Sequence, residues 1–300
     1  MIVITIVFVS SIINAAPGQA IEDSEDDSPW YIFGYGSLLS SSSRIRTECG
    51  LRGVREDFIE WATKNLNVDV VFNKEKGDCI RENQAKQFIP AQISGYRRGW
   101  YAAPEINGLP QNDLFIAPTY LGLIKDSDYN TTGLLYSVTK DQLNVTDDRE
   151  RDYLFETLTK KDLTLYGDKD IPDHAKIRVY ASPAYPFDLP TKEFPIVQSY
   201  LDVFLGGTIE IEEDNPEIET FALNTCKQTY GWVGGWVNDR PYPKYRAKLS
   251  SLRAEKIDAL LFKCMEENKA DMILQESSLK QQPELKPLTS AAIGSITFSD

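Results

Sequence analysis

The stretch YIFGYGSLLSSSSR, residues 31–44, decides how the rest of the chain is interpreted. Its apolar run Tyr31–Phe33 is typical of a buried strand, and the run stops at Gly34–Ser37. Two glycines one residue apart allow another group to approach the main chain closely, because neither carries a Cβ. We therefore expect a strand over 30–33, followed by a loop that a second segment or a substrate can touch.

Beyond this strand the sequence changes from strand-like to helix-like patterns. This order favours an α+β fold over alternating βαβ units, and no internal repeat is present. The predicted strands are 91–102, 119–124, 132–138, 155–166 and 176–181, and the predicted helices are 55–66, 140–149, 195–207, 216–228 and 250–267.

Three local patterns make sharper predictions. The turn-forming stretch DSDYNT, residues 126–131, predicts a hairpin between 119–124 and 132–138, with Asn130 at its tip. The pair Gly206–Gly207 predicts the C-terminal end of helix 195–207. Two helices are expected to bury one face at helical spacing. These faces consist of Phe58, Trp61, Ala62 and Leu66 in the first, and of Leu252, Ile257, Leu260, Leu261 and Cys264 in the second.

The N-terminus has the pattern of a secretory signal peptide. Residues 1–20 carry no charge and combine an apolar run with small residues, and the run is shorter than the roughly 20 apolar residues of a spanning helix. No Lys or Arg precedes the run, so a buried N-terminal strand is the alternative. An acidic linker over 21–29, a domain over 30–268 with a C-terminal helical part, and a loosely ordered tail over 269–300 complete the expected organisation.

Two further features fit an exported, extracellular chain. Asn130 and Asn144 begin glycosylation sequons. The four cysteines suggest two disulfides in an exported protein, with three pairings possible. We expect Cys49–Cys79 and Cys226–Cys264, which pair neighbours within each half, and four buried free thiols are the alternative.

Composition and missing motifs exclude several functions. The formal net charge of −13 argues against nucleic acid or an anionic membrane as the main partner. The single histidine, His174, rules out histidine-rich metal sites, and no C-x-x-C or P-loop pattern occurs. The G-x-G of Gly34 and Gly36 lacks the third glycine of a dinucleotide fingerprint. We expect neither a metal nor an organic cofactor.

Carboxylates are the remaining candidates for catalysis. Ser37 does not fit the nucleophile pattern G-x-S-x-G, and its only possible histidine base, His174, lies in a predicted connecting loop. The stretch LLYSVTKDQLNVTDDRERDY, residues 134–153, combines a strand, a turn, a short helix and an acidic run. A carboxylate there can act as a general base if a pocket raises its pKa, although a solvated charge run is the simpler interpretation.

The order of these motifs resembles the γ-glutamylcyclotransferase family. The motifs FGYGSLL, GYRRGW, LLYSVTKDQLNVTDDRERDY and NDRPYPKY together cover about 30–261, and the N-terminal motif is similar to the glutathione-degrading branch. The resemblance implies a mixed β-barrel or sheet with surrounding helices and extra C-terminal helices. It also implies a cofactor-independent enzyme that cyclises a small γ-glutamyl substrate to 5-oxoproline and releases an amine.

The resemblance also assigns residues. The catalytic glutamate of the family corresponds to Glu150, through the spacing of Leu143, Asp147 and Glu150. The family's substrate loop, which holds the γ-glutamyl group through main-chain N–H groups, corresponds to the run Tyr35, Gly36, Ser37 and Leu38. Tyr153 corresponds to a tyrosine that follows the glutamate. Leu38 departs from the asparagine of shorter members, and Thr146 replaces an apolar residue before Asp147.

Four arginines are also assigned roles from the sequence. Arg44 is a candidate for binding a substrate α-carboxylate. The glycine- and aromatic-rich block 231–241 is a candidate for closing one side of the pocket, with Arg240 pairing with a carboxylate. A packed loop between helices is the alternative for that block. Arg97 and Arg98 are expected to be exposed residues of a strand.

Three functional hypotheses follow. The first is a secreted γ-glutamylcyclotransferase-like enzyme with Glu150 as general acid and base. The second is a catalytically silent secreted protein that uses the same fold as a binding module. The third is a related amide transferase that acts on γ-glutamylamines in the same pocket. The oligomeric state and the amine that is released do not follow from the sequence.

Overall fold

The computed structural model describes residues 28–51, 53–102, 118–182, 189–191, 194–232, 235–243 and 249–267. The expected signal peptide, all of the acidic linker before residue 28, and the expected tail lie outside these residues. The described chain is an α+β fold, as expected, with a mixed sheet surrounded by helices. None of the described helices is long and apolar enough to cross a membrane.

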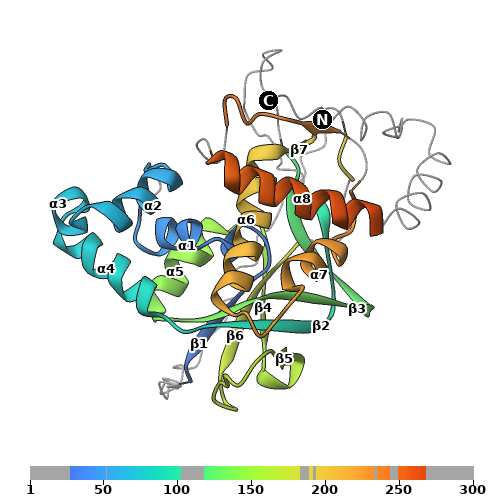
Figure 1. The fold of residues 1–300 in the computed structure, drawn as a ribbon. Helices are drawn as coiled ribbons and strands as arrows, with labels where there is room; N and C mark the ends of the chain where they lie inside the picture. Colours follow the sequence, from blue (N-terminus) through green and yellow to red (C-terminus); the bar gives the residue numbers. More distant parts are fainter. Residues whose placement is uncertain are drawn as a thin grey trace, which may run out of the picture.

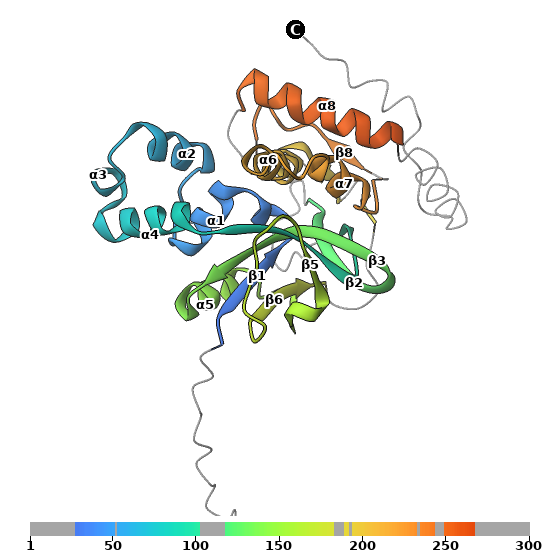
Figure 2. The ribbon, with the colours of Figure 1, turned by 60° about the horizontal axis from the view of Figure 1, so that its bottom comes forward.

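A six-stranded mixed sheet lies at the centre of the described chain, in the order β4-β6-β1-β3-β2-β5. β1 pairs antiparallel with β3 and parallel with β6, so the first strand of the domain lies inside the sheet. β2 and β3 are long and curve past β1 (Figure 2). The strands are β1 (Trp30–Gly34), β2 (Phe88–Ala102), β3 (Tyr120–Val138), β4 (Leu154–Leu158), β5 (Leu163–Leu165) and β6 (Lys176–Ala181).

Helices cover the sheet in two groups (Figure 1). The C-terminal helices α6 (Gln198–Asp214), α7 (Phe221–Lys227) and α8 (Ser251–Glu267) lie together over one side of the sheet, near the short parallel pair β7 (Ile196–Val197) and β8 (Trp236–Val237). The second group, which we call the helical module, extends to one side. It contains α1 (Ser41–Glu48), α2 (Glu56–Asn65), α3 (Val68–Phe72) and α4 (Lys74–Ala85).

The two predicted disulfides are confirmed. Cys49–Cys79 joins the end of α1 to α4 inside the helical module, beside a small apolar core of its own. Cys226–Cys264 joins α7 to α8. Each disulfide therefore ties together elements that pack on one another, and no described cysteine is free.

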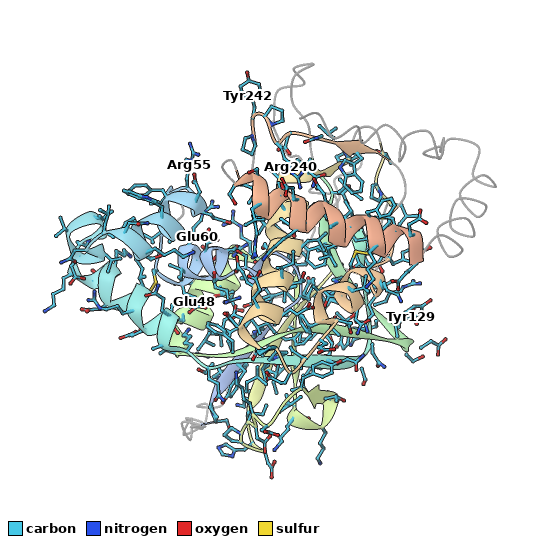
Figure 3. The ribbon with its side chains drawn as sticks, viewed as in Figure 1. Glu48, Arg55, Glu60, Tyr129, Arg240 and Tyr242 are labelled. Atoms are coloured by element: carbon cyan, nitrogen blue, oxygen red, sulfur yellow. A yellow bond between two sulfur atoms is a disulfide. The ribbon has the colours of Figure 1, made fainter. Side chains whose placement is uncertain are left out.

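The predicted hairpin is wrong. Residues 120–138 form one strand, which pairs with β2 along its length. Ser94 pairs with Asn130 and Tyr96 pairs with Lys125, so the turn-forming residues 126–129 bulge opposite Gly95. Gly95 has φ +80°, a backbone conformation that glycine adopts easily. The turn chemistry thus produces a bulge within the β2–β3 ladder, between its two paired stretches, and Figure 3 labels Tyr129 there. Asn130 is exposed, but it lies in the strand and not at a loop tip.

Helix α6 does not end at Gly206–Gly207 but continues to Asp214. A Cβ at Gly207 would lie only 2.5 Å from the main-chain nitrogen of Ser40 and 2.6 Å from the carbonyl carbon of Leu39. The glycine therefore serves close packing of α6 on the chain that follows the Tyr35–Ser37 loop, and not helix termination.

The buried face of α2 is also different from the predicted one. Ile59 and Ala62 are fully buried, whereas Phe58 and Trp61 are 40% and 50% exposed and Leu66 is also exposed. The three exposed residues do not reach the main core because the module packs around its own core, to which Ile59 belongs. In α8, Ile257, Leu261 and Cys264 are buried as expected, but Leu252 is exposed.

Two other predicted elements are shorter or interrupted, and a third has the predicted bounds. The strand expected over 155–166 is two strands, β4 and β5, separated by the short 3-10 helix η2 (Lys160–Asp162). The helix expected over 216–228 is only α7. The helix predicted over 140–149 is confirmed as α5 (Lys140–Arg149).

Candidate active site

Helix α5 places Glu150 at its C-terminal end. The helix starts with a capping box, in which Thr139 Oγ1 accepts from the N–H of Gln142 at 3.2 Å and Gln142 Oε1 accepts from the N–H of Thr139 at 3.1 Å. It ends where the N–H of Glu150 donates to the Thr146 carbonyl at 2.9 Å. Local hydrogen bonds at both ends therefore determine where α5 begins and that it ends at Glu150.

Asp147 fixes the orientation of α5 against the sheet. Its carboxylate accepts from the Tyr180 hydroxyl at 2.9 Å and lies 3.2 Å from both Nε and Nη2 of Arg178. Both partners belong to β6. The aspartate of the predicted D-x-x-E pattern is thus a structural anchor, and the glutamate three residues later is held beside the loop after β1.

Arg149 joins the two predicted motifs. Its Nε lies 3.1 Å from Glu150 Oε1, and its Nη2 donates to Ser37 Oγ at 2.7 Å. The same guanidinium also donates to the hydroxyl of Thr47, and it lies 3.5 Å from Ser43 Oγ. Residues more than a hundred positions apart in the sequence therefore meet through one side chain. Ser37 uses its hydroxyl here as a hydrogen-bond acceptor.

Four tyrosines form one cluster, and the charge of Glu150 acts on three of them, Tyr35, Tyr153 and Tyr200. Tyr35 and Tyr200 are buried, and Tyr120 and Tyr153 are partly buried. The Tyr35 hydroxyl donates to the Tyr180 carbonyl at 2.5 Å, and the Tyr153 hydroxyl donates to the Leu121 carbonyl at 3.1 Å. The rings of Tyr120 and Tyr200 meet edge to face at 5.2 Å. We refer to Tyr35, Tyr120, Tyr153 and Tyr200 as the tyrosine cluster.

The tyrosine cluster and Glu150 affect one another electrostatically. Burial raises the pKa of Tyr35, Tyr153 and Tyr200, and the nearby Glu150 carboxylate raises it further. The three phenols therefore stay protonated and polar in the presence of the carboxylate. A Cβ at Gly36 would lie 3.3 Å from the Tyr200 hydroxyl, so the loop runs directly past this cluster.

Burial raises the pKa of Glu150, which has a side chain only 14% exposed. The Arg149 guanidinium lowers that pKa, and Asp152 raises it by charge repulsion. The net shift moves the pKa of Glu150 upward, toward neutral pH. A group with a pKa near the working pH can both accept and return a proton. An enclosed carboxyl group with a raised pKa makes Glu150 a candidate functional residue.

The remaining sequence candidates lie as follows. Leu38 is buried and its carbonyl accepts from Arg44 Nη1 at 2.9 Å. The same nitrogen also donates to the Leu39 carbonyl at 2.8 Å. The Arg44 guanidinium carbon lies 4.2 Å from the centre of the Phe88 ring. Arg44 therefore supports the segment that follows the loop after β1. His174 is exposed in a loop before β6.

Arg240 pairs with carboxylates of the protein itself. Its guanidinium contacts Asp202 of α6 at 2.7–2.8 Å and Asp258 of α8 at 2.8 Å. Arg240 therefore links α6 to α8, which agrees with the alternative of a packed loop between helices. Figure 3 labels Arg240 beside α8.

The prediction that Arg98 is exposed is wrong: it is completely buried, while its neighbour Arg97 faces the other side of β2 and pairs with Asp126 at 3.3 Å. Alternation along a strand places adjacent residues on opposite faces, and the interior face here is polar enough to hold a guanidinium. Sequence reasoning also missed Arg149, Tyr120 and Tyr200. Only Arg149, next to the candidate base in the acidic run, had a signal that would have singled it out.

A separate cavity of about 650 Å³ lies between the helical module and helices α6 and α8. Charged residues of both signs line it, among them Arg44, Glu60, Glu210 and Arg253, and Figure 3 labels Glu60 on α2. Glu150 and the tyrosine cluster are not among its lining residues. No group of three or more possible metal-ligating side chains occurs in the described part of the chain.

Comparisons with known proteins are sparse. No protein-family model matches the sequence, and no curated protein matches it significantly. A solved structure described as "Gamma-glutamyl cyclotransferase" is 12% identical, with a TM-score of 0.38 over 77% of this chain and 99% of that one. An uncharacterized protein from Homo sapiens is 11% identical, with a TM-score of 0.36 over the same shares. YkqA from Bacillus subtilis is 15% identical, with a TM-score of 0.35 over 65% of this chain and 55% of that one. Similarity this low carries no argument about activity.

Proposed function

We propose that this protein is a γ-glutamylcyclotransferase-like enzyme with Glu150 as its general acid and base. It would convert a γ-glutamyl amide, in a peptide, an amine conjugate or glutathione, to 5-oxoproline and a free amine. The observation that carries the proposal is the bridge made by Arg149, which lies 3.1 Å from Glu150 Oε1 and 2.7 Å from Ser37 Oγ. A buried carboxylate and a glycine-containing loop thereby share one site.

The reaction needs only proton transfer and a folded substrate. The substrate's α-amine attacks its own γ-amide carbonyl, so one C–N bond forms and the amide C–N bond breaks. The α-nitrogen loses two protons between its ammonium form and the ring amide, and the leaving nitrogen gains two. Glu150 would relay these protons, since its raised pKa favours both acceptance and return. Because the nucleophile is already tethered, folding the substrate and excluding water are the remaining tasks.

The loop and the tyrosine cluster would supply these remaining functions. Main-chain N–H groups of Gly36, Ser37 and Leu38 would hold the γ-carbonyl as negative charge develops on its oxygen. Tyr35 and Tyr153 would line the substrate site, and the rings of the tyrosine cluster would exclude water from it. This assignment leaves the γ-glutamyl half of the substrate in the enclosed part of the site.

We also propose that the protein is secreted and N-glycosylated. The two disulfides fit an oxidising compartment. Asn144 is exposed on α5, while its neighbours Leu143 and Thr146 are buried, so a glycan there would extend away from Glu150. Asn130 is exposed on β3. Expression in a secretory host, followed by a mass shift on glycosidase treatment, tests this proposal.

The decisive experiment measures 5-oxoproline after incubation of the purified protein with glutathione, γ-glutamyl-alanine and γ-glutamyl-lysine. We expect Glu150→Gln to fold and to lose activity by about 10²-fold or more. Asp148→Asn is the matched control, because Asp148 lies on the same helix with a side chain 58% exposed. Full activity of Glu150→Gln would refute the assignment of the base.

The same assay separates the alternatives. Activity on γ-glutamyl-lysine alone would indicate an enzyme for γ-glutamylamines. A folded wild-type protein that turns over none of the three substrates, but binds 5-oxoproline in a calorimetric titration, would indicate a silent binding module.

A further inference from the structure

Arg98 is an arginine without any exposed surface, in the middle of β2. Its Nε donates to Thr229 Oγ1 at 2.8 Å, its Nη1 donates to the Thr132 carbonyl at 2.6 Å, and its Nη2 donates to the Thr225 carbonyl. The guanidinium also lies 5.3 Å from the centre of the Phe204 ring. All of these partners are neutral, and within the described ranges no carboxylate forms an ion pair with it.

A buried cation without a counterion is an expensive feature of a fold. Neutral hydrogen-bond acceptors satisfy its N–H groups, but they do not replace the hydration of a full charge. Burial accordingly lowers the pKa of Arg98 to about 9. An apolar side chain of similar length would fill the same space, so packing alone does not explain the arginine.

The position of Arg98 supplies an explanation. Its Nη1 also lies 3.5 Å from the carbonyl oxygen of Tyr35. In a planar trans peptide the N–H of the next residue points away from this carbonyl, so the N–H of Gly36 is directed to the opposite side of the peptide plane from Arg98. The buried charge therefore lies directly behind a main-chain N–H of the proposed substrate loop.

We propose that Arg98 is a positioning residue for the cyclisation, which fixes and polarises the Tyr35–Gly36 peptide so that the Gly36 N–H stabilises the oxyanion formed on the γ-carbonyl. The inference rests on the proposed function. A cation behind the carbonyl strengthens the dipole of the peptide, and its field favours negative charge in front of the N–H. Since the oxyanion develops only during reaction, Arg98 would act on kcat more than on KM.

Arg98→Met and Arg98→Lys test this role, with Arg97→Met as the control from the other face of β2. We expect Arg98→Met to lower kcat about 10–10²-fold with KM changed less than threefold, and Arg98→Lys to restore part of the loss. The midpoint of urea unfolding should stay the same or rise in Arg98→Met, because an unpaired charge has been removed. Arg97→Met should keep wild-type kcat and KM.

Other results would overturn the proposal. A purely structural arginine predicts that Arg98→Met lowers the unfolding midpoint and that kcat falls only as the folded fraction falls. An active wild type with unchanged kcat in folded Arg98→Met would refute the role of Arg98 and leave the proposed function standing. A wild type inactive on all γ-glutamyl substrates would refute both. If Arg98→Met does not fold, the kinetics of Arg98→Lys decide. A lower kcat with an unchanged KM would support the fixed geometry of the guanidinium, whereas a wild-type kcat would show that any cation suffices.

Discussion

Two internal arginines, Arg98 and Arg240, show opposite solutions to the same electrostatic problem. Arg240 meets two carboxylates, Asp202 and Asp258, which join α6, α8 and the connecting block. Arg98 is more deeply buried, and its hydrogen-bond partners among the described residues are all neutral oxygens, one of them in the loop after β1. A charge that is neutralised locally stabilises the fold, whereas a charge left without a counterion creates a field that acts on something else. The comparison separates a structural region from a candidate functional one.

The largest expected effect is the loss of stability in Arg240→Ala. Asp202 is 2% exposed and would lose its only cationic partner among the described residues, and Asp258 would lose its partner as well. Breaking such a buried pair costs about 3–5 kcal/mol. Urea unfolding measures this change, and the activity per folded molecule should be unchanged. Activity that falls independently of folding would show that the two regions are not separable.

Gly207→Ala tests how closely the two regions are coupled, because α6 carries both Asp202 and Gly207. The new Cβ would lie 2.5 Å from the Ser40 nitrogen, a backbone atom that cannot rotate away. We expect a loss of about 1–3 kcal/mol, as for other overpacked sites, and a loss of activity, because the displaced chain follows the substrate loop. Gly53→Ala is the control, since a Cβ there meets nothing within 4 Å. Wild-type activity in Gly207→Ala would show that the loop is independent of α6.

The fold was predictable where short-range patterns decide it. The apolar strand after Pro29, the capping box at Thr139 and the spacing of Ile257, Leu261 and Cys264 each specify an element by themselves. The errors lie where tertiary contacts override a local pattern. A turn-forming stretch became a bulge because β2 continues alongside it, and Gly207 continues a helix because it packs against Ser40.

The candidate site was predictable only in its two motifs. Glu150 and the loop at Gly36 have recognisable neighbours in the sequence, and the resemblance connected them. Tyr200 and Arg98 lie in segments that look like an ordinary helix and an ordinary strand. Their part in the site depends on how α6 and β2 pack around the loop, and no local spacing encodes that packing.

A smaller effect is expected from Arg149→Met, which removes the one nearby cation that lowers the pKa of Glu150. The pKa of Glu150 should rise further, so the basic form needed for the first proton transfer appears only at higher pH. The acidic limb of the kcat/KM profile should move to higher pH. At pH values below the shifted pKa of Glu150, kcat/KM should fall about tenfold relative to wild type. Arg151→Met is the control, because the Arg151 side chain is 71% exposed and pairs with Asp148. An unshifted limb would mean that another group titrates.

The smallest expected effect concerns the stability of Glu150→Gln. Burial raises the pKa of Glu150 in the folded state above its value of about 4.3 in the unfolded chain. Below both values the group is protonated in both states and contributes nothing. As pH rises past the unfolded value, the unfolded chain ionises first, so the folded wild type loses stability until pH passes the raised pKa. Glutamine does not ionise and avoids this loss.

Urea unfolding at several pH values should therefore show Glu150→Gln at least as stable as wild type near pH 7, with the difference vanishing near pH 4. Asp148→Asn provides the background for removing an exposed carboxylate from the same helix. The opposite result, a variant that becomes less stable than wild type as pH rises, would mean that Arg149 holds Glu150 as a stabilising partner. Glu150 would then resemble Asp202 beside Arg240, and the distinction between a structural and a functional region would no longer hold.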